Sequence, residues 1–237
     1  MIWQRHRHTS PSMSPQALAA TWQVTSLLLD YPDGSLPARR DMLQAVIETL
    51  PAEPARLLQV ALSQLAGTET AQLQRAYVET FDITRRCALH LTYATHGDTR
   101  RRGVALVEFT QAYRQAGVEL AGTTELPDHL CVVLEFGAAH NADIAWRLLT
   151  RHRVSIEVLR AALADRESPW LAVVDALRAT LPPLEGDDHE ALAKLIAQGP
   201  PEEEVGMEGY SLDPALLREP EPSGVLLGSD IPVGAGR

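Results

Sequence analysis

The sequence predicts an all-α protein: a single compact helical-bundle domain with a disordered acidic C-terminal tail. Apolar residues recur at helical spacing almost everywhere between Ser14 and Leu181, and the alternation typical of strands is nearly absent. From Pro183 onward, proline, glycine and acidic residues prevail, and apolar content is too low to offset the entropy of ordering. The expected organisation is a flexible N-terminus at 1–14, a helical domain at 15–182, and a tail at 183–237 with a short helix at 188–198.

Four helices are expected before residue 82. Ser14 can cap the first, with Pro15 in its first turn. Pro51 stops the second helix, and Gly67 is a suitable C-terminal stop for the third. Each helix carries an apolar stripe at helical spacing. The stripes are Leu18, Trp22, Thr25 and Leu29; Leu43, Val46, Ile47 and Leu50; Leu58, Ala61, Leu62 and Leu65; and, from Thr70, Leu73, Tyr77 and Phe81.

The second half contains an ambiguous stretch, 82–97, followed by further helices. A lone strand at 89–93 would leave its hydrogen-bonding groups unpaired, so irregular or helical structure is expected there. Asp98 and Asp128 both occupy positions suited to helix caps. The expected helices run from Asp98 to Gly122, from Asp128 to Ala139, from Asn141 to Asp165 with a break near His152, and from Pro169 to Leu181.

Charge and apolar runs exclude two classes of partner. The net charge is −10, and the tail carries 12 acidic and 3 basic residues, so the first 182 residues are nearly neutral. Such a body gives no reason to expect nucleic-acid binding. The longest apolar runs are five residues, far short of the ~20 that span a bilayer. The N-terminus lacks an apolar signal core, so we expect a cytoplasmic protein without stable membrane association.

No motif for catalysis, phosphate binding or metal ligation is present, and neither a metal nor a cofactor is expected. Cys87 and Cys131 lie 44 positions apart with no neighbouring ligand set, which indicates reduced core thiols. These features favour a protein that binds another protein over an enzyme.

The pentad 125–129 is the first candidate site. Its residues could simply build a helix N-terminus, with Asp128 as the cap. Alternatively, two carboxylates and a titratable histidine gather where recognition residues often lie. The candidate binding residues here are Glu125, Pro127, Asp128 and His129.

Two further groups accompany the pentad. Tyr77, Phe81 and Tyr93 could line an apolar groove for an amphipathic helix, although such spacing also fits core packing. Cations are unfavourable in a first helical turn, so the arginines near residue 100 suggest contact with carboxylates or phosphates of a partner, against the alternative of a solvated surface. This group comprises Arg85, Arg86, Arg100, Arg101 and Arg102.

Four ordered blocks stand out in the middle of the chain: Tyr77–Asp82, Arg85–Tyr93, His96–Gly103, and Glu125–Leu130 with Val133–Phe136. Together they resemble the NarJ-type assembly chaperones of respiratory nitrate reductase, within the TorD/DmsD-like group of redox-enzyme maturation chaperones. The resemblance spans about residues 27–206. Cys131 and His90 depart from the pattern, and no spacer separates Pro127 from Asp128.

The resemblance implies a TorD-like helical fold and a non-enzymatic role. A member of this family would bind the N-terminal segment of the nitrate reductase α subunit. It would hold the αβ complex competent for molybdenum cofactor insertion and delay its membrane attachment, with the cofactor insertion machinery as a further partner. The alternatives are a sister chaperone for another molybdoenzyme, a nucleotide-binding regulator that uses the arginines, and an enzyme that uses Asp128 and His129 as a base pair.

Overall fold

The computed structural model describes residues 11, 13–120 and 125–201 of the chain. Within these residues every regular element is a helix, as the sequence predicts. The α-helices are α1 (Pro15–Leu29), α2 (Leu36–Ile47), α3 (Ala52–Ala66), α4 (Thr70–Tyr77), α5 (Tyr93–His96), α6 (Arg100–Gln115), α7 (Leu130–Ala139), α8 (Ala142–Arg151), α9 (Arg153–Asp165), α10 (Leu171–Arg178) and α11 (Asp188–Gln198). A π-helical turn, η1 (Val78–Asp82), extends α4, and a 3-10 turn, η2 (Arg85–Cys87), follows it.

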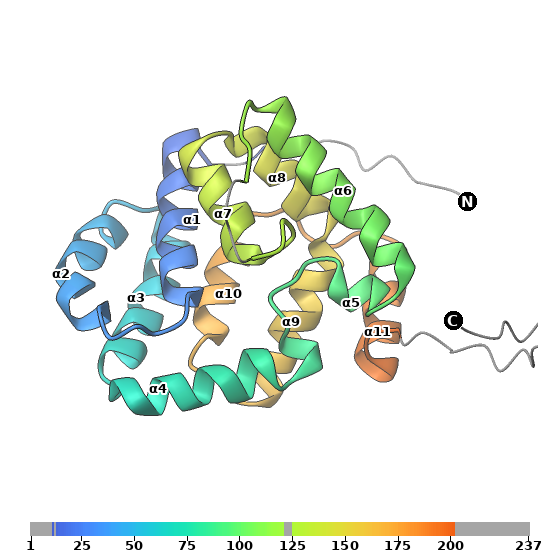
Figure 1. Ribbon diagram of the computed structural model, residues 1–237. Coiled ribbons are helices and arrows are strands. Elements are labelled where there is room, and N and C mark those ends of the chain that lie inside the picture. Colours follow the sequence, from blue (N-terminus) through green and yellow to red (C-terminus); the bar gives the residue numbers. More distant parts are fainter. Residues whose placement is uncertain (1–10, 12, 121–124, 202–237) are drawn as a thin grey trace, which may run out of the picture. The chain divides into compact units, whose positions relative to one another are not determined.

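Helix α1 organises the bundle, since it packs against α2, α3, α7, α8 and α10 (Figure 1). Its apolar stripe is buried, and Trp22 is fully enclosed. The indole N–H of Trp22 donates to Thr180 Oγ1 at 3.0 Å, and that of Trp170 donates to the Leu28 carbonyl at 3.1 Å. Both large rings therefore enter the core without leaving a polar group unpaired.

Close approach of α1, α7 and α8 depends on Gly137. A Cβ at this position would lie 2.6 Å from the Ala145 Cβ and 2.7 Å from the Trp22 ring. Side-chain atoms do not pack that closely, so the absence of a side chain at Gly137 sets the spacing of these three helices.

Several predicted helix ends are confirmed. Ser14 accepts a hydrogen bond from the Ala17 N–H at 3.2 Å, with Pro15 at the first helical position. His152 separates α8 from α9, where its ring packs against Phe109. The helix predicted at 188–198 is α11.

Two predicted caps are wrong. Helix α6 begins at Arg100, preceded by Thr99, and Asp98 bonds to side chains elsewhere. Helix α7 begins at Leu130 with His129 at the N-cap position, and the fully buried Asp128 before it accepts from Thr92 and His90 instead. Capping preference is local, whereas Asp128 accepts from Thr92 and His90 in a distant segment, and Asp98 pairs with arginine side chains.

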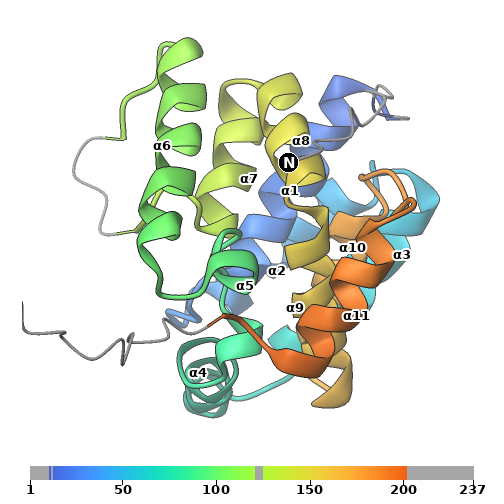
Figure 2. The same ribbon diagram turned by 90° about the vertical axis from the view of Figure 1, so that its right-hand side faces the viewer.

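Two predicted boundaries also differ. Helix α6 ends at Gln115, before the positive φ of Gly117, and not at Gly122, which lies outside the described residues. After the two prolines at 182 and 183, α11 packs against α9, as Figure 2 shows, so the packed body continues past residue 182. The carbonyl of Pro201 lies against Gly97, where a Cβ would come within 1.7 Å. The rest of the predicted disordered tail, 202–237, lies outside the described residues.

Candidate functional site

Asp128 is the centre of a buried polar cluster. Its Oδ2 accepts from the Thr92 N–H at 3.0 Å and from the Thr92 hydroxyl at 2.5 Å, while Oδ1 lies 3.1 Å from His90 Nδ1. Burial raises the pKa of this carboxyl, but the hydrogen bonds from His90 and Thr92 outweigh it and lower the pKa to about 2. Asp128 is therefore an ionised, internal acceptor that ties the pentad to a segment 36 residues earlier.

Backbone hydrogen bonds also join the pentad and Leu130 to the segment 89–91. The Leu91 N–H donates to the Asp128 carbonyl at 3.0 Å, and the Leu130 N–H donates to the Leu89 carbonyl at 2.8 Å. These bonds flank an antiparallel bridge between His90 and His129. The expectation of irregular or helical structure at 89–93 is confirmed, since turns precede α5, which begins at Tyr93. Backbone groups of Leu89 and Leu91 are nevertheless paired, with Leu130 and Asp128.

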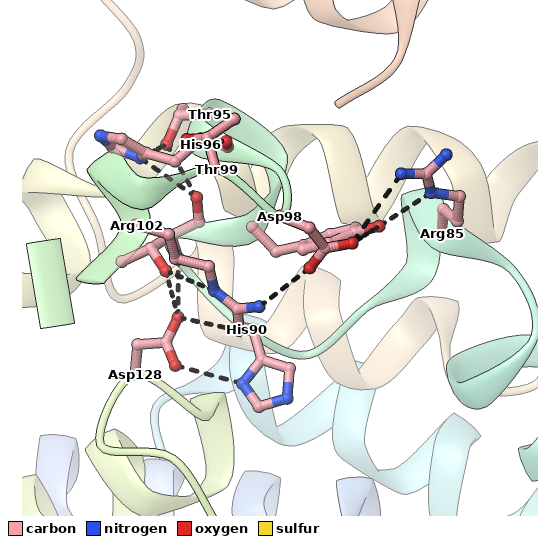
Figure 3. A network of polar contacts seen from close by, with 10 residues as sticks. Arg85, His90, Thr95, His96, Asp98, Thr99, Arg102 and Asp128 are labelled. Atoms are coloured by element: carbon pink, nitrogen blue, oxygen red, sulfur yellow. Dashed lines mark hydrogen bonds and ion pairs between the residues drawn. The ribbon is translucent and has the colours of Figure 1, made fainter. Parts of the chain in front are cut away.

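A second set of contacts, the arginine layer, runs from Arg102, beside Asp128, through Asp98 to Arg85, as Figure 3 shows. Arg102 donates from Nε to Thr92 Oγ1 at 3.3 Å, and its Nη2 is 3.9 Å from Asp128 Oδ2. Asp98 lies 3.5 Å from Arg102 Nη1 and 3.9 Å from Arg85 Nη2. Tyr93 completes the layer, since its hydroxyl accepts from Arg85 Nε at 2.8 Å and Arg102 lies over its ring. These contacts within the chain account for the cation of Arg102 in the first turn of α6. The argument from helix position alone had predicted a contact with a partner molecule.

A groove of about 600 Å³ opens on the other side of the pentad. Its floor is aromatic: Tyr77 and Phe81 pack with ring centroids 4.7 Å apart, and Tyr31 stands edge-on to Tyr77. The Tyr77 hydroxyl donates to the Leu29 carbonyl, and burial raises its pKa well above the ordinary value. The described lining residues are Asp30, Tyr31, Tyr77, Phe81, Asp82, Ala88, Leu89, His90, Glu125, His129, Cys131, Val132 and Glu135.

The groove is negatively charged. Its described lining contains four carboxylates, Asp30, Asp82, Glu125 and Glu135, and neither lysine nor arginine. Burial, together with the charge of Asp30, raises the pKa of Glu135. An aromatic floor below a carboxylate rim suits a segment that carries both apolar and cationic side chains.

His129 links the polar cluster to the groove. Burial lowers the pKa of its imidazole, and so does the neighbouring His90, whose ring lies edge-on 5.2 Å away. Its Nδ1 has no hydrogen-bond partner among the described residues. His129 therefore lies in the groove wall with its buried Nδ1 unpaired among the described residues. The hydrogen bonds of the neighbouring Asp128 fix the position of this part of the chain.

The predicted site residues separate into three sets. Tyr77, Phe81, Glu125 and His129 line the groove together. The others of the binding group lie behind it: Asp128 and Tyr93 belong to the polar clusters, and the Pro127 carbonyl accepts from the Tyr113 hydroxyl at 2.6 Å. Arg85, Arg86, Arg100 and Arg101 are all exposed, although Arg85 also contacts Tyr93 and Asp98, and Arg102 is half-buried beside Asp128.

Sequence reasoning missed His90, Tyr31 and the carboxylates of Asp30, Asp82 and Glu135. His90 gave one signal: it stands between the apolar residues Leu89 and Leu91, and so points away from their side of the chain. The acidic residues gave none, since they come from the ends of α1 and η1 and from the middle of α7 and meet only in the folded chain.

Two features are absent from the residues that the structure describes. No group of three or more histidine, cysteine, aspartate or glutamate side chains is arranged to hold a metal ion there. No helix in that part of the chain is long and apolar enough to cross a membrane. Cys87 and Cys131 are buried free thiols, as predicted.

The described residues form an all-helical protein with an acidic, aromatic-floored groove. Residues 47–175 match the model of the family described as nitrate reductase delta subunit, and the chain belongs to this family. The resemblance read from the four sequence blocks is thereby confirmed.

Named relatives agree with this membership, and one solved structure shares the fold. The chain is 34% identical over 157 residues to the nitrate reductase molybdenum cofactor assembly chaperone NarJ of Escherichia coli K12, covering 65% of this chain and 66% of that protein. It is 29% identical to the probable chaperone of that name from Bacillus subtilis, covering 68% and 88%. It is 38% identical to the nitrate reductase-like protein NarX of Mycobacterium tuberculosis, of which it spans only 23%. A crystal structure of a redox enzyme maturation protein described as putative, from Archaeoglobus fulgidus, has the same fold, with a TM-score of 0.50 at 21% identity over 73% of this chain and 97% of that one.

Proposed function

We propose that this protein is a cytoplasmic assembly chaperone for nitrate reductase. It binds the N-terminal segment of the α subunit, keeps the αβ complex competent for molybdenum cofactor insertion and delays membrane attachment. Membership of the family and the names of the related chaperones support the general role. The protein acts by binding and performs no covalent chemistry of its own.

The observation that carries the proposal is the acidic groove with its aromatic floor. A client segment folded as an amphipathic helix would place apolar side chains on Tyr31 and Tyr77 and cationic side chains near Asp30, Asp82 and Glu135. None of these three carboxylates forms a salt bridge with another described residue, so their charge is available to a partner.

The polar clusters behind the groove give it a fixed shape. Asp128 and Thr92 join the pentad to the 89–92 segment, so His90 and His129 form one wall. A pre-formed groove binds a flexible segment with less loss of conformational entropy than one that must first be ordered. Contact of the exposed Arg86, Arg100 and Arg101 with carboxylates elsewhere on the αβ complex remains part of the proposal.

The test is calorimetric binding of a peptide that matches the N-terminal segment of the cognate α subunit. Tyr31 is 46% exposed over the floor, so Tyr31→Ala should raise Kd about tenfold, a loss of ~1.4 kcal/mol. Glu135→Gln should raise Kd by a smaller factor and reduce its salt dependence between about 50 and 500 mM. Glu190→Gln, an exposed charge change on α11 outside the groove, is the matched control.

Unchanged affinity in both groove variants would show that the client binds elsewhere. Pull-down from cells that contain several molybdoenzymes identifies the client. Capture of a different catalytic subunit would replace the nitrate reductase assignment with that of a sister chaperone.

A further inference from the structure

A second cavity, of about 780 Å³, is bordered by α3, α9, α10, α11 and the loop that precedes α11. Helix α9 packs against both α10 and α11, and Figure 2 shows α9 beside α11. One part of its lining is apolar and includes Leu57, Leu181 and Leu192. The other part is charged, and its composition differs sharply from that of the acidic groove.

The charged lining has an excess of guanidinium groups. Four arginines stand against three carboxylates. The residues are Arg56, Arg153, Arg160 and Arg178, and Glu53, Glu157 and Asp175.

Three of the arginines converge on two carboxylates. Arg153 Nη2 and Arg178 Nε both lie 2.7 Å from the same oxygen of Glu157. Arg178 Nη1 and Arg160 Nε lie 3.0 and 3.1 Å from one oxygen of Asp175. Since arginine does not deprotonate in proteins, this cluster holds one positive charge more than its carboxylates can balance.

The burial of Arg153 makes the excess positive charge of this cluster energetically unfavourable. Only 6% of this residue is exposed, and its Nε donates to the Pro182 carbonyl at 3.1 Å. Its Nη1 has no hydrogen-bond partner among the described residues, and burial lowers the pKa of the guanidinium. A buried cation with an unused donor, beside further guanidinium groups that border a cavity, is stabilised by an added anion.

We propose that this cavity binds a small organic phosphate. The phosphate lies against Arg160 and Arg178, whose side chains are 37% and 34% exposed, and balances the excess charge of the cluster. The organic body packs on the leucines opposite. A phosphate fits better than a carboxylate because its oxygens point in several directions and can accept from guanidinium groups on both α9 and α10. The volume lies within the ~300–1,000 Å³ typical of small-molecule sites.

The test uses the full chain with three probes at constant ionic strength: phenyl phosphate, benzoate and inorganic phosphate, each titrated by calorimetry. Phenyl phosphate should bind saturably with Kd below ~1 mM, and the other two at least about tenfold more weakly. Arg160→Gln should raise the Kd of phenyl phosphate about tenfold, and Leu192→Glu, which adds a negative charge to the lining, should also raise it. Arg40→Gln, on the exposed surface of α2, should match the wild type.

Each opposite result overturns the proposal. Phenyl phosphate that fails to saturate by ~10 mM, or binds equally to wild type and to both cavity variants, rules out the site. If benzoate binds as tightly as phenyl phosphate, the site has no preference for phosphate over carboxylate. If inorganic phosphate binds as tightly, the apolar lining does not contribute to binding of the organic group. Arg160→Gln should leave client-peptide binding unchanged, so this result is independent of the proposed chaperone function.

Discussion

Asp128 should be the residue whose loss most weakens the candidate site, through the fold and not through direct client contact. Replacement by alanine leaves the N–H and hydroxyl of Thr92, the ring of His90 and the cation of Arg102 without their shared acceptor. All of these groups lie around a carboxylate that is completely buried. Removal of one member of such a buried charged cluster typically costs 3–5 kcal/mol.

The pKa gives a second measure of the same contribution. Asp128 titrates at about 2 in the fold, against an ordinary value of 3.8. A difference of nearly two pH units corresponds to about 2 kcal/mol of stabilisation at neutral pH. We therefore expect the free energy of unfolding to fall by about 3 kcal/mol in Asp128→Ala and by about 2 kcal/mol in Asp128→Asn, which keeps the shape but not the charge.

The sign of the pH dependence follows from the lowered pKa. A carboxylate with a lower pKa in the folded state stabilises the fold above the unfolded pKa, and this contribution is lost as the pH falls through the folded pKa. The gap in unfolding free energy between wild type and Asp128→Asn should therefore be constant above about pH 5, shrink below about pH 4, and disappear only below about pH 2.

Urea denaturation followed by circular dichroism measures these differences. Asp98→Asn is the matched control, because Asp98 belongs to the same layer but its side chain is 68% exposed, and such pairs contribute less than ~1 kcal/mol. A loss of only ~1 kcal/mol in Asp128→Ala, the usual effect of removing a helix cap, would refute the role as a buried acceptor.

Two further changes test the packing and the arginine layer. Gly137→Ala should lower the free energy of unfolding by about 1–3 kcal/mol, because its Cβ would overlap Trp22, and an unchanged thermal midpoint would contradict the close approach of α1 and α7. Arg102→Gln should destabilise the fold by more than ~1 kcal/mol in urea, whereas the exposed Arg101→Gln should change it by less than ~0.5 kcal/mol. Equal effects of the two arginine changes on the free energy of unfolding would show that the internal contacts of Arg102 do not stabilise the fold.

The sequence alone determined the helical class and much of its segmentation, because these properties depend on neighbours within a few turns. The stripe of Leu18, Trp22 and Leu29 predicts a helix with one buried face, and α1 buries that face. Ser14 and the break at His152 are local signals of the same kind. The four blocks that resemble the family also identified the pentad and two aromatic residues, Tyr77 and Phe81, that line the groove.

Only the tertiary structure decided what the polar residues do. Asp128 looked like a cap, since a carboxylate before a helix commonly bonds to its first N–H groups, but Thr92 and His90, far away in sequence, provide donors in a buried setting where charged hydrogen bonds are stronger. The negative charge of the groove could not be predicted from the sequence either. Its carboxylates come from three separate elements and meet only in the folded chain, at Asp30, Asp82 and Glu135. Hydrophobic periodicity is fixed by local geometry, whereas the partner of a charge is fixed by which distant segments the packed core brings together.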